Sequence, residues 1–361
     1  MKHSSPGLLE SVLVMRIKAT SGGQPERILL ARIGALGDTI MALPVAQALK
    51  ANTPSYSIEF LCSTSTAPLV ELSPPIDRVY RLSHRNIPYR LSREKQKLSV
   101  RLGDQQYSHA ILMESAPRFL KLLSAIGLSQ IRSYVNQPFD AQLHSIENNL
   151  RLAGLDAGAI NPFEIELDLS ASSCIGFKEH LEGLPRPVVG IHPGYGPPGR
   201  KNNQTAKLRG WPQSSFVRVS QSLQKLGASI IITGSALDVP DAHCIAAALE
   251  PMQTRILAGQ TTLPQLAGLL SELDLFLSVD SGPAHLCAAV KTPLIVLWGP
   301  GKWVQTRPVS SGAAVELLRK PLPCSPCYDL PAMKSCRRNI CMELVRPEEV
   351  FDTCRRLLGL L

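Results

Sequence analysis

The chain has 361 residues, about twice the length of a typical domain, and 44% of them are hydrophobic, which favours two folded domains and excludes a disordered protein. No stretch approaches the ~20 apolar residues needed to cross a bilayer, and 5% aromatic residues are too few for a stacking platform for single-stranded nucleic acid. The 38 Lys and Arg residues outnumber the 29 Asp and Glu residues, and a net charge of +9 predicts anionic partners.

Residues 1–25 contain an apolar run, but Glu10 interrupts it and no small-residue cleavage site follows. We therefore interpret residues 1–25 as an N-terminal extension rather than a signal peptide. Nine cysteines, an odd number in a long chain, favour a reduced, cytoplasmic setting over a disulfide framework.

From Arg27 onward, short apolar runs alternate with amphipathic stretches, a pattern typical of α/β proteins with parallel sheets. In the first half this pattern predicts one helix, Thr39–Lys50, and the strands Arg27–Ile33, Ser57–Cys62, Arg78–Leu82 and His109–Met113. After a stretch rich in Ser, Gly and Pro, the pattern starts again with the strands Pro187–His192, Ala228–Thr233, Leu275–Val279 and Pro293–Trp298. The helices expected in this second half are Ser214–Leu226, Leu263–Leu270, Pro283–Val290 and Pro347–Leu361.

These elements predict two similar α/β halves rather than one large sheet. We expect an N-terminal domain over residues 26–172, a linker over residues 173–187 and a C-terminal domain over residues 188–346. The last segment, residues 347–361, is expected to form a helix that packs back on the N-terminal domain.

The loop Gly34–Asp38 follows the first strand, where doubly wound folds bind ligands. Its G-x-x-G-D spacing lacks the dinucleotide fingerprint G-x-G-x-x-G, and the GxxxxGK[ST] phosphate loop occurs nowhere in the chain. Asp38 begins the following helix, so it is either a helix cap or a catalytic carboxylate.

A second loop, VDSGPAHL from Val279 to Leu286, also joins a strand to a helix. The main-chain N–H groups of Ser281, Gly282 and Ala284 are predicted to face an anion, helped by the helix dipole. In this interpretation the Asp280 carboxylate meets sugar hydroxyls and His285 binds phosphate or ribose. The alternative is a capped helix.

Two segments are strongly basic. The loop Gly194–Trp211 carries four cations, Lys207 and Arg209 among them, and no acidic residue, which suits either a diphosphate or a solvated loop. The segment Arg78–Arg101 has eight Lys and Arg residues and one Glu, so it is a solvated face or a basic surface for a phosphorylated acceptor or an anionic membrane. The charge also suits nucleic acid, but no nucleic-acid-binding module is present to support that partner.

Four thiols lie within 18 residues near the C-terminus, and their spacing is compatible with a tetrahedral metal site. They are Cys324, Cys327, Cys336 and Cys341. A structural zinc or iron ion and reduced structural cysteines are the two interpretations.

Taken together, these segments resemble glycosyltransferase family 9, the lipopolysaccharide heptosyltransferases. The resembling parts are ILLARIGALGDTIMALPVAQAL, GIHPG…AKLRGWP, the segment from ILAGQTTLPQLAGLL through DSGPAHLCAAVKTPLIVLWGP, and CSPC…C…CMELVRPEEV. The resemblance implies the GT-B fold, in which two Rossmann-like α/β domains face each other across a cleft. The N-terminal domain would then hold the acceptor and the C-terminal domain the nucleotide-sugar.

The resemblance also implies roles for single residues. By motif position Asp38 matches the family's general base, Lys207 its phosphate-binding lysine, and Asp280, Ser281, Gly282 and His285 its donor loop. Transfer would be inverting, from ADP-heptose to an anionic acceptor of the lipopolysaccharide inner core, with no divalent metal or other cofactor. We expect a cytoplasmic enzyme with peripheral contact to the inner membrane.

The chain departs from the family pattern around the nucleotide. Gly194 and Tyr195 stand where the family has threonines, and Asp238 is the carboxylate nearest to the position where the family has a glutamate that contacts ribose. We predict that these three residues contact the donor. Because they differ from the family pattern, the identity of the donor stays open. Arg118 and Lys121 are the predicted acceptor contacts. The alternatives are a different nucleotide-sugar, a protein or capsule acceptor, a dinucleotide oxidoreductase and a non-catalytic nucleotide binder.

Overall fold

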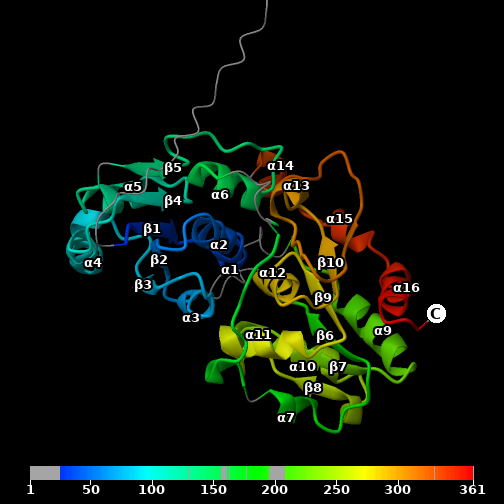
Figure 1. The fold of residues 1–361 in the computed structure, drawn as a ribbon. Helices are drawn as coiled ribbons and strands as arrows, with labels where there is room; N and C mark the ends of the chain where they lie inside the picture. Colours follow the sequence, from blue (N-terminus) through cyan, green and yellow to red (C-terminus); the bar gives the residue numbers. More distant parts are fainter. Residues whose placement is uncertain are drawn as a thin grey trace, which may run out of the picture.

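The computed structural model describes residues 25–128, 130–155, 161, 163–175, 177–194, 208–328 and 330–360 (Figure 1). Most of the predicted N-terminal extension and part of the predicted basic loop, residues 195–207, lie outside these ranges. Within them, no helix combines the length and the apolar composition that crossing a membrane requires.

The first half forms a five-stranded sheet in the order β3-β2-β1-β4-β5, and every neighbouring pair is parallel. Its strands are β1 Arg27–Arg32, β2 Ser57–Ser63, β3 Arg78–Leu82, β4 His109–Leu112 and β5 Ile131–Ser133. The central strand is a continuous apolar run whose residues Ile28 to Ala31 are fully buried, because helices cover both faces of the sheet.

The second half forms a six-stranded parallel sheet in the order β11-β10-β9-β6-β7-β8. Its strands are β6 Val188–His192, β7 Ser229–Ile232, β8 Thr254–Ile256, β9 Leu275–Val279, β10 Leu294–Trp298 and β11 Val315–Arg319. When the strands of each half are numbered from its own first strand, both sheets begin with the order 3-2-1-4-5. This is the order of doubly wound α/β folds. The predicted pair of parallel α/β halves is confirmed.

Helices connect the strands of each half. In the first half they are α1 Leu36–Ile40, α2 Leu43–Asn52, α3 Ala67–Val70, η1 Tyr89–Leu91, α4 Arg93–Gly103, α5 Pro117–Ser124 and α6 Ser145–Ala153. Between the sheets, within the predicted linker region, lie η2 Ser172–Cys174 and α7 Lys178–Leu181. In the second half they are α9 Gln213–Gln224, η3 Ala236–Asp238, α10 Val239–Ala246, η4 Pro251–Gln253, α11 Leu263–Ser271, α12 Gly282–Ala289, α13 Trp303–Thr306, α14 Pro331–Ser335, α15 Ile340–Glu343 and α16 Pro347–Leu357.

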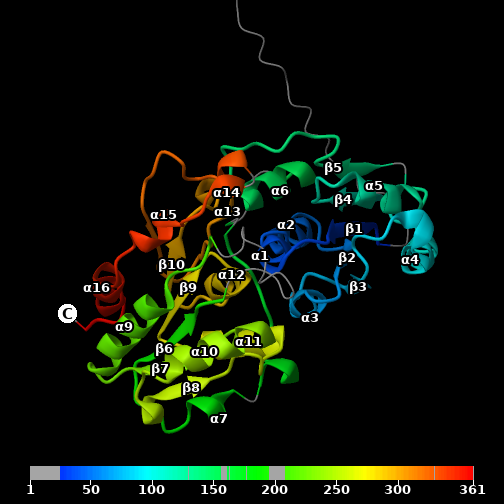
Figure 2. The same ribbon diagram turned by 180° about the vertical axis from the view of Figure 1, so that it is seen from behind.

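The two halves meet at α1 and α12, which pack side by side in the middle of the molecule (Figures 1 and 2). A single hydrophobic core continues across this contact and contains Phe60 of β2 as well as Phe276 of β9 and Leu286 of α12. Since α1 follows β1 and α12 follows β9, the contact brings together the carboxyl ends of one strand from each sheet.

Two expectations about helices are wrong. The expected helix Thr39–Lys50 is two helices, α1 and α2, because Pro44 lies in the first turn of α2, where a missing N–H is tolerated, and not inside one continuous helix. The C-terminal helix α16 packs on α9 of the second half rather than on the N-terminal domain. Its buried residues Val350 and Cys354 belong to the same core cluster as Trp211 and Phe216.

Candidate active site

Asp38 lies at the carboxyl end of the first sheet, close to the point where the strand order reverses between β1 and β4. It is the third residue of α1, and the N-cap position is Ala35, so Asp38 is not a helix cap. The Asp38 Oδ1 atom lies 2.9 Å from Arg32 Nη2, and the side chain remains 36% exposed. An accessible carboxylate at this edge suits a proton acceptor, and the catalytic role of Asp38 stays a prediction.

Asp280 lies at the carboxyl end of the second sheet, directly after β9. Its side chain is 8% exposed, and its Oδ2 atom lies 2.7 Å from Arg209 Nη2. Burial raises the pKa of Asp280 above its ordinary range, and Asp38 adds to the rise, whereas the Arg209 guanidinium opposes it. Helix α1 packs against α12, so the structure brings the segment that carries Asp38 together with the predicted donor loop.

The rest of the donor loop begins α12. Ser281 is the N-cap residue in an extended conformation, and its hydroxyl lies 2.9 Å from Ser278 Oγ. Gly282 is the first helical residue. The N–H of Ala284 already donates to the Ser281 carbonyl at 3.2 Å, so the expectation that this N–H faces an anion is wrong.

His285 of α12 lies directly against Gly37 of α1. A Cβ atom on Gly37 would come within 2.6 Å of His285 Cδ2, and one on Gly282 would come within 2.7 Å of Leu36 Cβ, so the two helices approach this closely only because both positions are glycine. Burial lowers the pKa of His285 to about 3, so its imidazole is uncharged near neutral pH. A neutral imidazole exchanges hydrogen bonds with a donor ligand without adding positive charge.

Gly194 and Asp238 lie together beside the carboxyl ends of β6 and β7. A Cβ atom on Gly194 would come within 2.8 Å of the Asp238 carboxylate. That carboxylate accepts from the Ser235 N–H at 2.7 Å and from the Ser235 hydroxyl at 2.6 Å, which makes Asp238 part of a capping box at η3. Donor contact by Gly194 and Asp238 stays a prediction, and Tyr195 and Lys207 lie outside the described residues.

Arg209 is one of the four cations that the sequence places in the basic loop Gly194–Trp211, but its pairing with Asp280 was not predicted. Besides its ion pair with Asp280, its guanidinium carbon lies 5.5 Å from the centre of the Tyr328 ring, and its buried Nε has no hydrogen-bond partner among the described residues. Burial alone would lower the pKa of Arg209, but Asp280 raises it, so the cation keeps its charge. Two residues on, Trp211 is 5% exposed and donates to the Val345 carbonyl at 2.9 Å, which anchors this end of the basic loop.

The predicted acceptor contacts lie on α5, which follows β4. Arg118 and Lys121 are both exposed, and the Arg118 guanidinium lies 4.8 Å from the centre of the Phe119 ring. Helix α5 packs against η1 and α4, so both residues adjoin the basic segment Arg78–Arg101. Their contact with an acceptor stays a prediction.

The four predicted metal ligands line one largely apolar cavity of about 270 Å³, together with Leu208 and Pro300. Among the described residues, which include all four thiols, no group of three or more His, Cys, Asp or Glu side chains is arranged to hold a metal ion. Burial raises the pKa of Cys341 to about 11. The predicted structural zinc or iron at Cys324, Cys327, Cys336 and Cys341 therefore has no support.

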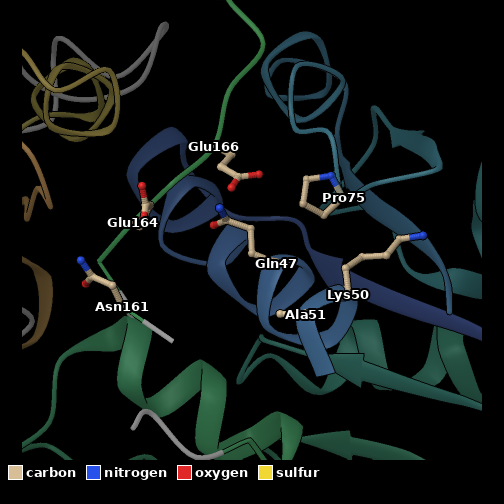
Figure 3. Close-up of a pocket in the computed structure, with 7 residues that line it drawn as sticks. All are labelled: Gln47, Lys50, Ala51, Pro75, Asn161, Glu164 and Glu166. Carbon is tan, nitrogen blue, oxygen red and sulfur yellow. The ribbon is translucent and has the colours of Figure 1, made fainter. Parts of the chain in front are cut away.

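A second cavity, of about 350 Å³, lies beside α2 and is polar (Figure 3). Gln47 and Lys50 of α2 line one side, and Glu164 and Glu166 line the other. With its amide oriented for bonding, Gln47 donates to the Glu164 carbonyl at 2.8 Å and accepts from the Glu166 N–H at 3.0 Å. None of the predicted site residues lines this cavity.

The sequence profile of "Glycosyltransferase family 9 (heptosyltransferase)" matches residues 97–336. The chain belongs to glycosyltransferase family 9. It is 28% identical over 303 residues to lipopolysaccharide heptosyltransferase 3 of Escherichia coli K12, a match that covers 75% of this chain and 82% of that protein. This membership makes the chain a glycosyltransferase and rules out the oxidoreductase alternative.

Solved structures agree with the fold of the family 9 chain. A family 9 glycosyltransferase from Veillonella parvula superposes with a TM-score of 0.78 at 17% identity, covering 94% of this chain and 99% of that one. The E. coli ADP-heptose lipopolysaccharide heptosyltransferase II superposes with a TM-score of 0.73 at 19% identity, covering 92% and 99%. The expected GT-B fold, with two Rossmann-like domains, is confirmed.

Proposed function

We propose that this glycosyltransferase moves a heptose from ADP-heptose to an acceptor of the lipopolysaccharide inner core, with inversion and without a divalent metal. The observation that carries the proposal is the packing of α1, which bears the accessible Asp38 carboxylate, against α12, which follows the Arg209–Asp280 ion pair at the carboxyl end of β9. One side of this arrangement accepts a proton and the other side holds an anionic leaving group.

The proposed reaction is a single displacement. Asp38 takes the proton of an acceptor hydroxyl while the hydroxyl oxygen bonds to the anomeric carbon of the heptose. The bond from that carbon to the diphosphate breaks on the opposite face, so the configuration inverts and ADP leaves. A positioned base of this kind typically contributes ~10²–10⁴-fold to the rate.

The leaving ADP carries the developing negative charge. We assign its stabilisation to Arg209, to Lys207 and to the N-terminus of α12 at Ser281 and Gly282, since cations and a helix N-terminus are suited to a diphosphate. Gly194, Tyr195, Asp238, Asp280 and His285 are the proposed contacts to the rest of the donor. The relative named ADP-heptose lipopolysaccharide heptosyltransferase II supports ADP-heptose as that donor.

We place the acceptor beside Arg118 and Lys121, since an anionic inner core suits exposed cations at this edge of the first sheet. We further propose that the enzyme works in the cytoplasm at the inner membrane, which it contacts peripherally through η1 and α4. Leu91 is 76% exposed and Val100 is 67% exposed on this basic segment. Exposed apolar side chains among cations are suited to an anionic bilayer.

The experiment that tests the proposal is transfer of heptose from ADP-heptose to deacylated inner-core oligosaccharide, followed by mass spectrometry. Asp38→Asn is expected to lower kcat by at least 10²-fold, because it removes the base and keeps the shape, and to leave ADP binding within about threefold. Thermal shifts with ADP, UDP, GDP, CMP and NAD identify the nucleotide, since a ligand at 100 times its Kd adds about 2.7 kcal/mol to the stability. Normal turnover of Asp38→Asn overturns the assignment of Asp38 as the base. A larger thermal shift with UDP or GDP than with ADP overturns the assignment of ADP-heptose as the donor.

A further inference from the structure

Arg32, the last residue of β1, reaches two carboxylates at the carboxyl edge of the first sheet. Its Nη2 atom lies 2.9 Å from Asp38 Oδ1, and its Nη1 atom lies 3.8 Å from Glu114 Oε2. The same Nη1 also donates to the Met113 carbonyl. The Arg32 side chain is 19% exposed, and its Nε is buried with no hydrogen-bond partner among the described residues, so the guanidinium is held at its two terminal nitrogens.

Glu114 is itself fixed to the sheet. Its Oε1 atom accepts from the Ile33 N–H at 2.9 Å, and its side chain is 11% exposed. Arg32 ends β1 and Ile33 follows it, whereas Met113 and Glu114 follow β4, so the arrangement joins the two strands between which the strand order reverses. Burial alone would lower the pKa of Arg32, but Asp38 and Glu114 raise it, so the guanidinium stays charged.

Gly34 makes the approach of Arg32 to Asp38 possible. A Cβ atom on Gly34 would come within 2.9 Å of Arg32 Nε, 3.0 Å of Asp38 Cβ and 3.1 Å of Asp38 Oδ2. Any larger residue would therefore push between the two side chains. The first glycine of the G-x-x-G-D loop thus serves the contact between Arg32 and Asp38.

We propose that Arg32, anchored by Glu114 and the Met113 carbonyl, is a positioning residue that fixes the orientation of the Asp38 carboxylate. The proposal rests on the proposed role of Asp38 as the base. Helix α1 has only five residues, and without a partner a carboxylate that is 36% exposed in its first turn would populate several rotamers. Because Arg32 engages Oδ1, the structure assigns Oδ2 as the atom that receives the acceptor proton.

In the reaction Arg32 neither gains nor loses a proton. The acceptor O–H bond breaks, its proton goes to Asp38 Oδ2, and its electron pair forms the new bond to the anomeric carbon. The diphosphate leaves with the electrons of the old bond. Arg32 contributes the orientation of the base, and a misplacement of about 1 Å at a reacting group costs on the order of 10² in rate.

The first test compares Arg32→Gln with Arg32→Lys. We expect Arg32→Gln to lower kcat by about 10- to 100-fold while the KM for donor and the Kd for ADP stay within about twofold, because the donor loop is untouched. Arg32→Lys keeps a cation next to Asp38 and is expected to retain more of the rate. Arg151→Gln is the matched control, since Arg151 pairs with Asp140 at 3.1 Å on the exposed face of α6 and is expected to keep full activity.

A double-mutant cycle separates positioning from a merely structural role. If Arg32 acts through Asp38, adding Arg32→Gln to Asp38→Asn lowers the residual rate by no more than about twofold. A full multiplicative loss overturns the proposal, and so does an Arg32→Gln variant with the kcat of the unmodified enzyme. High turnover of Asp38→Asn alone is a different result, which overturns the proposed base itself.

Gly34→Ala covers the case in which Arg32→Gln does not fold. This change keeps every charge and places a methyl group between Arg32 and Asp38. We expect the same pattern, a lower kcat with an unchanged Kd for ADP. A Gly34→Ala enzyme that folds and turns over at the normal rate overturns the proposal.

Discussion

Arg209 forms an ion pair with the buried Asp280. Removing either residue leaves the charge of the other without its partner, which lowers the stability of the folded protein. Removing one partner of such a pair typically destabilises a protein by 3–5 kcal/mol, because a buried charge loses its compensation. Asp280 is 8% exposed, and its pKa is already raised by burial. The pair is therefore expected to contribute both to the stability of the second domain and to the binding of an anionic donor.

Arg209→Met is expected to destabilise the protein by about 3 kcal/mol and to weaken ADP binding by roughly 10- to 100-fold. Without Arg209 the pKa of Asp280 rises further, so the folded state keeps a proton that the unfolded chain has released. Stability of the variant then falls as pH rises above the ordinary Asp range near ~4. Unfolding midpoints of variant and parent at pH 5 and pH 8 check this, with the larger deficit expected at pH 8.

The double variant Arg209→Met with Asp280→Asn is the control for the charge argument. It removes both charges, so it is expected to recover part of the lost stability and to lose the pH dependence, while ADP binding stays weak. Equal stability deficits at pH 5 and pH 8 in Arg209→Met would contradict the assignment of the effect to Asp280.

Sequence reasoning placed Asp38 and Asp280 at strand ends, and the resemblance to glycosyltransferase family 9 implied that the two domains carrying them face each other across a cleft. Neither arginine partner was predicted. Arg32 is close to Asp38 in the sequence but was interpreted only as part of the first strand, whereas Arg209 and Asp280 are 71 positions apart and only the finished fold brings them within 2.7 Å. The cysteine spacing left a metal site and reduced structural cysteines both open, and the spacing alone could not decide between them. It describes distances along the chain, whereas metal binding needs four thiolates that converge on one point.

At the scale of elements, the contact between α1 and α12 sets the distance between the proposed base and the proposed donor loop. Gly37 and Gly282 are the closest points of this contact. The helices carry Asp38 and the DSGPAH loop respectively, so a shift of one helix relative to the other changes the geometry of the site without changing any of its charges.

Gly37→Ala is expected to separate α1 from α12, because its Cβ would lie 2.6 Å from His285 Cδ2. Overpacking of this kind typically costs 1–3 kcal/mol, and a displaced Asp38 is expected to lower kcat about 10- to 100-fold with ADP binding retained. Steady-state kinetics and ADP titration measure both effects. Gly103→Ala at the end of α4 is the matched control, since its Cβ meets its nearest neighbour at an ordinary 3.5 Å, and an equal loss in both variants would contradict the expectation.

The central strands were predicted almost to the residue, because parallel strands buried on both faces are continuous apolar runs. The strands β5, β8 and β11 were missed, since each lies at a sheet edge and two of them have only three residues. Helix α4 was interpreted as a charged surface, because its buried face includes Lys95, whose ammonium donates to the Arg85 carbonyl at 3.0 Å. A buried lysine that bonds to a loop carbonyl leaves no apolar periodicity to detect.

At the scale of the whole molecule, the two domains are tied by more than the chain between them. The shared core is supplemented by hydrogen bonds between the halves, from His144 Nε2 to the Arg307 carbonyl at 2.9 Å and from Gln305 to the Ala141 carbonyl at 3.0 Å. Lys291 also pairs with Glu164 at 3.1 Å. The orientation of Asp38 toward Asp280 is therefore set by packing between domains, which sequence periodicity within either domain does not contain.

The placement of exposed positive charge also concerns the whole molecule. The surface formed by η1 and α4 carries Arg90, Arg93, Lys97 and Arg101, all exposed, beside the exposed Leu91. Helix α9 of the second domain lies at the opposite end of the molecule in both views (Figures 1 and 2). A bilayer bound through η1 and α4 would thus lie next to α5, which carries the proposed acceptor contacts Arg118 and Lys121.

Each cation near an anionic membrane surface contributes about 1 kcal/mol, so Arg93→Gln with Lys97→Gln is expected to weaken binding to vesicles containing phosphatidylglycerol about 30-fold. Leu91→Glu is expected to weaken it further by removing an apolar contact. Sedimentation with such vesicles measures this, and Arg218→Gln with Lys225→Gln on α9 is the charge-matched control, expected to bind as the parent does. Equal losses in both pairs, or equal binding to neutral phosphatidylcholine vesicles, would contradict the assignment. Transfer to a deacylated acceptor should be unchanged in the α4 variant, because that acceptor reaches Asp38 without a membrane.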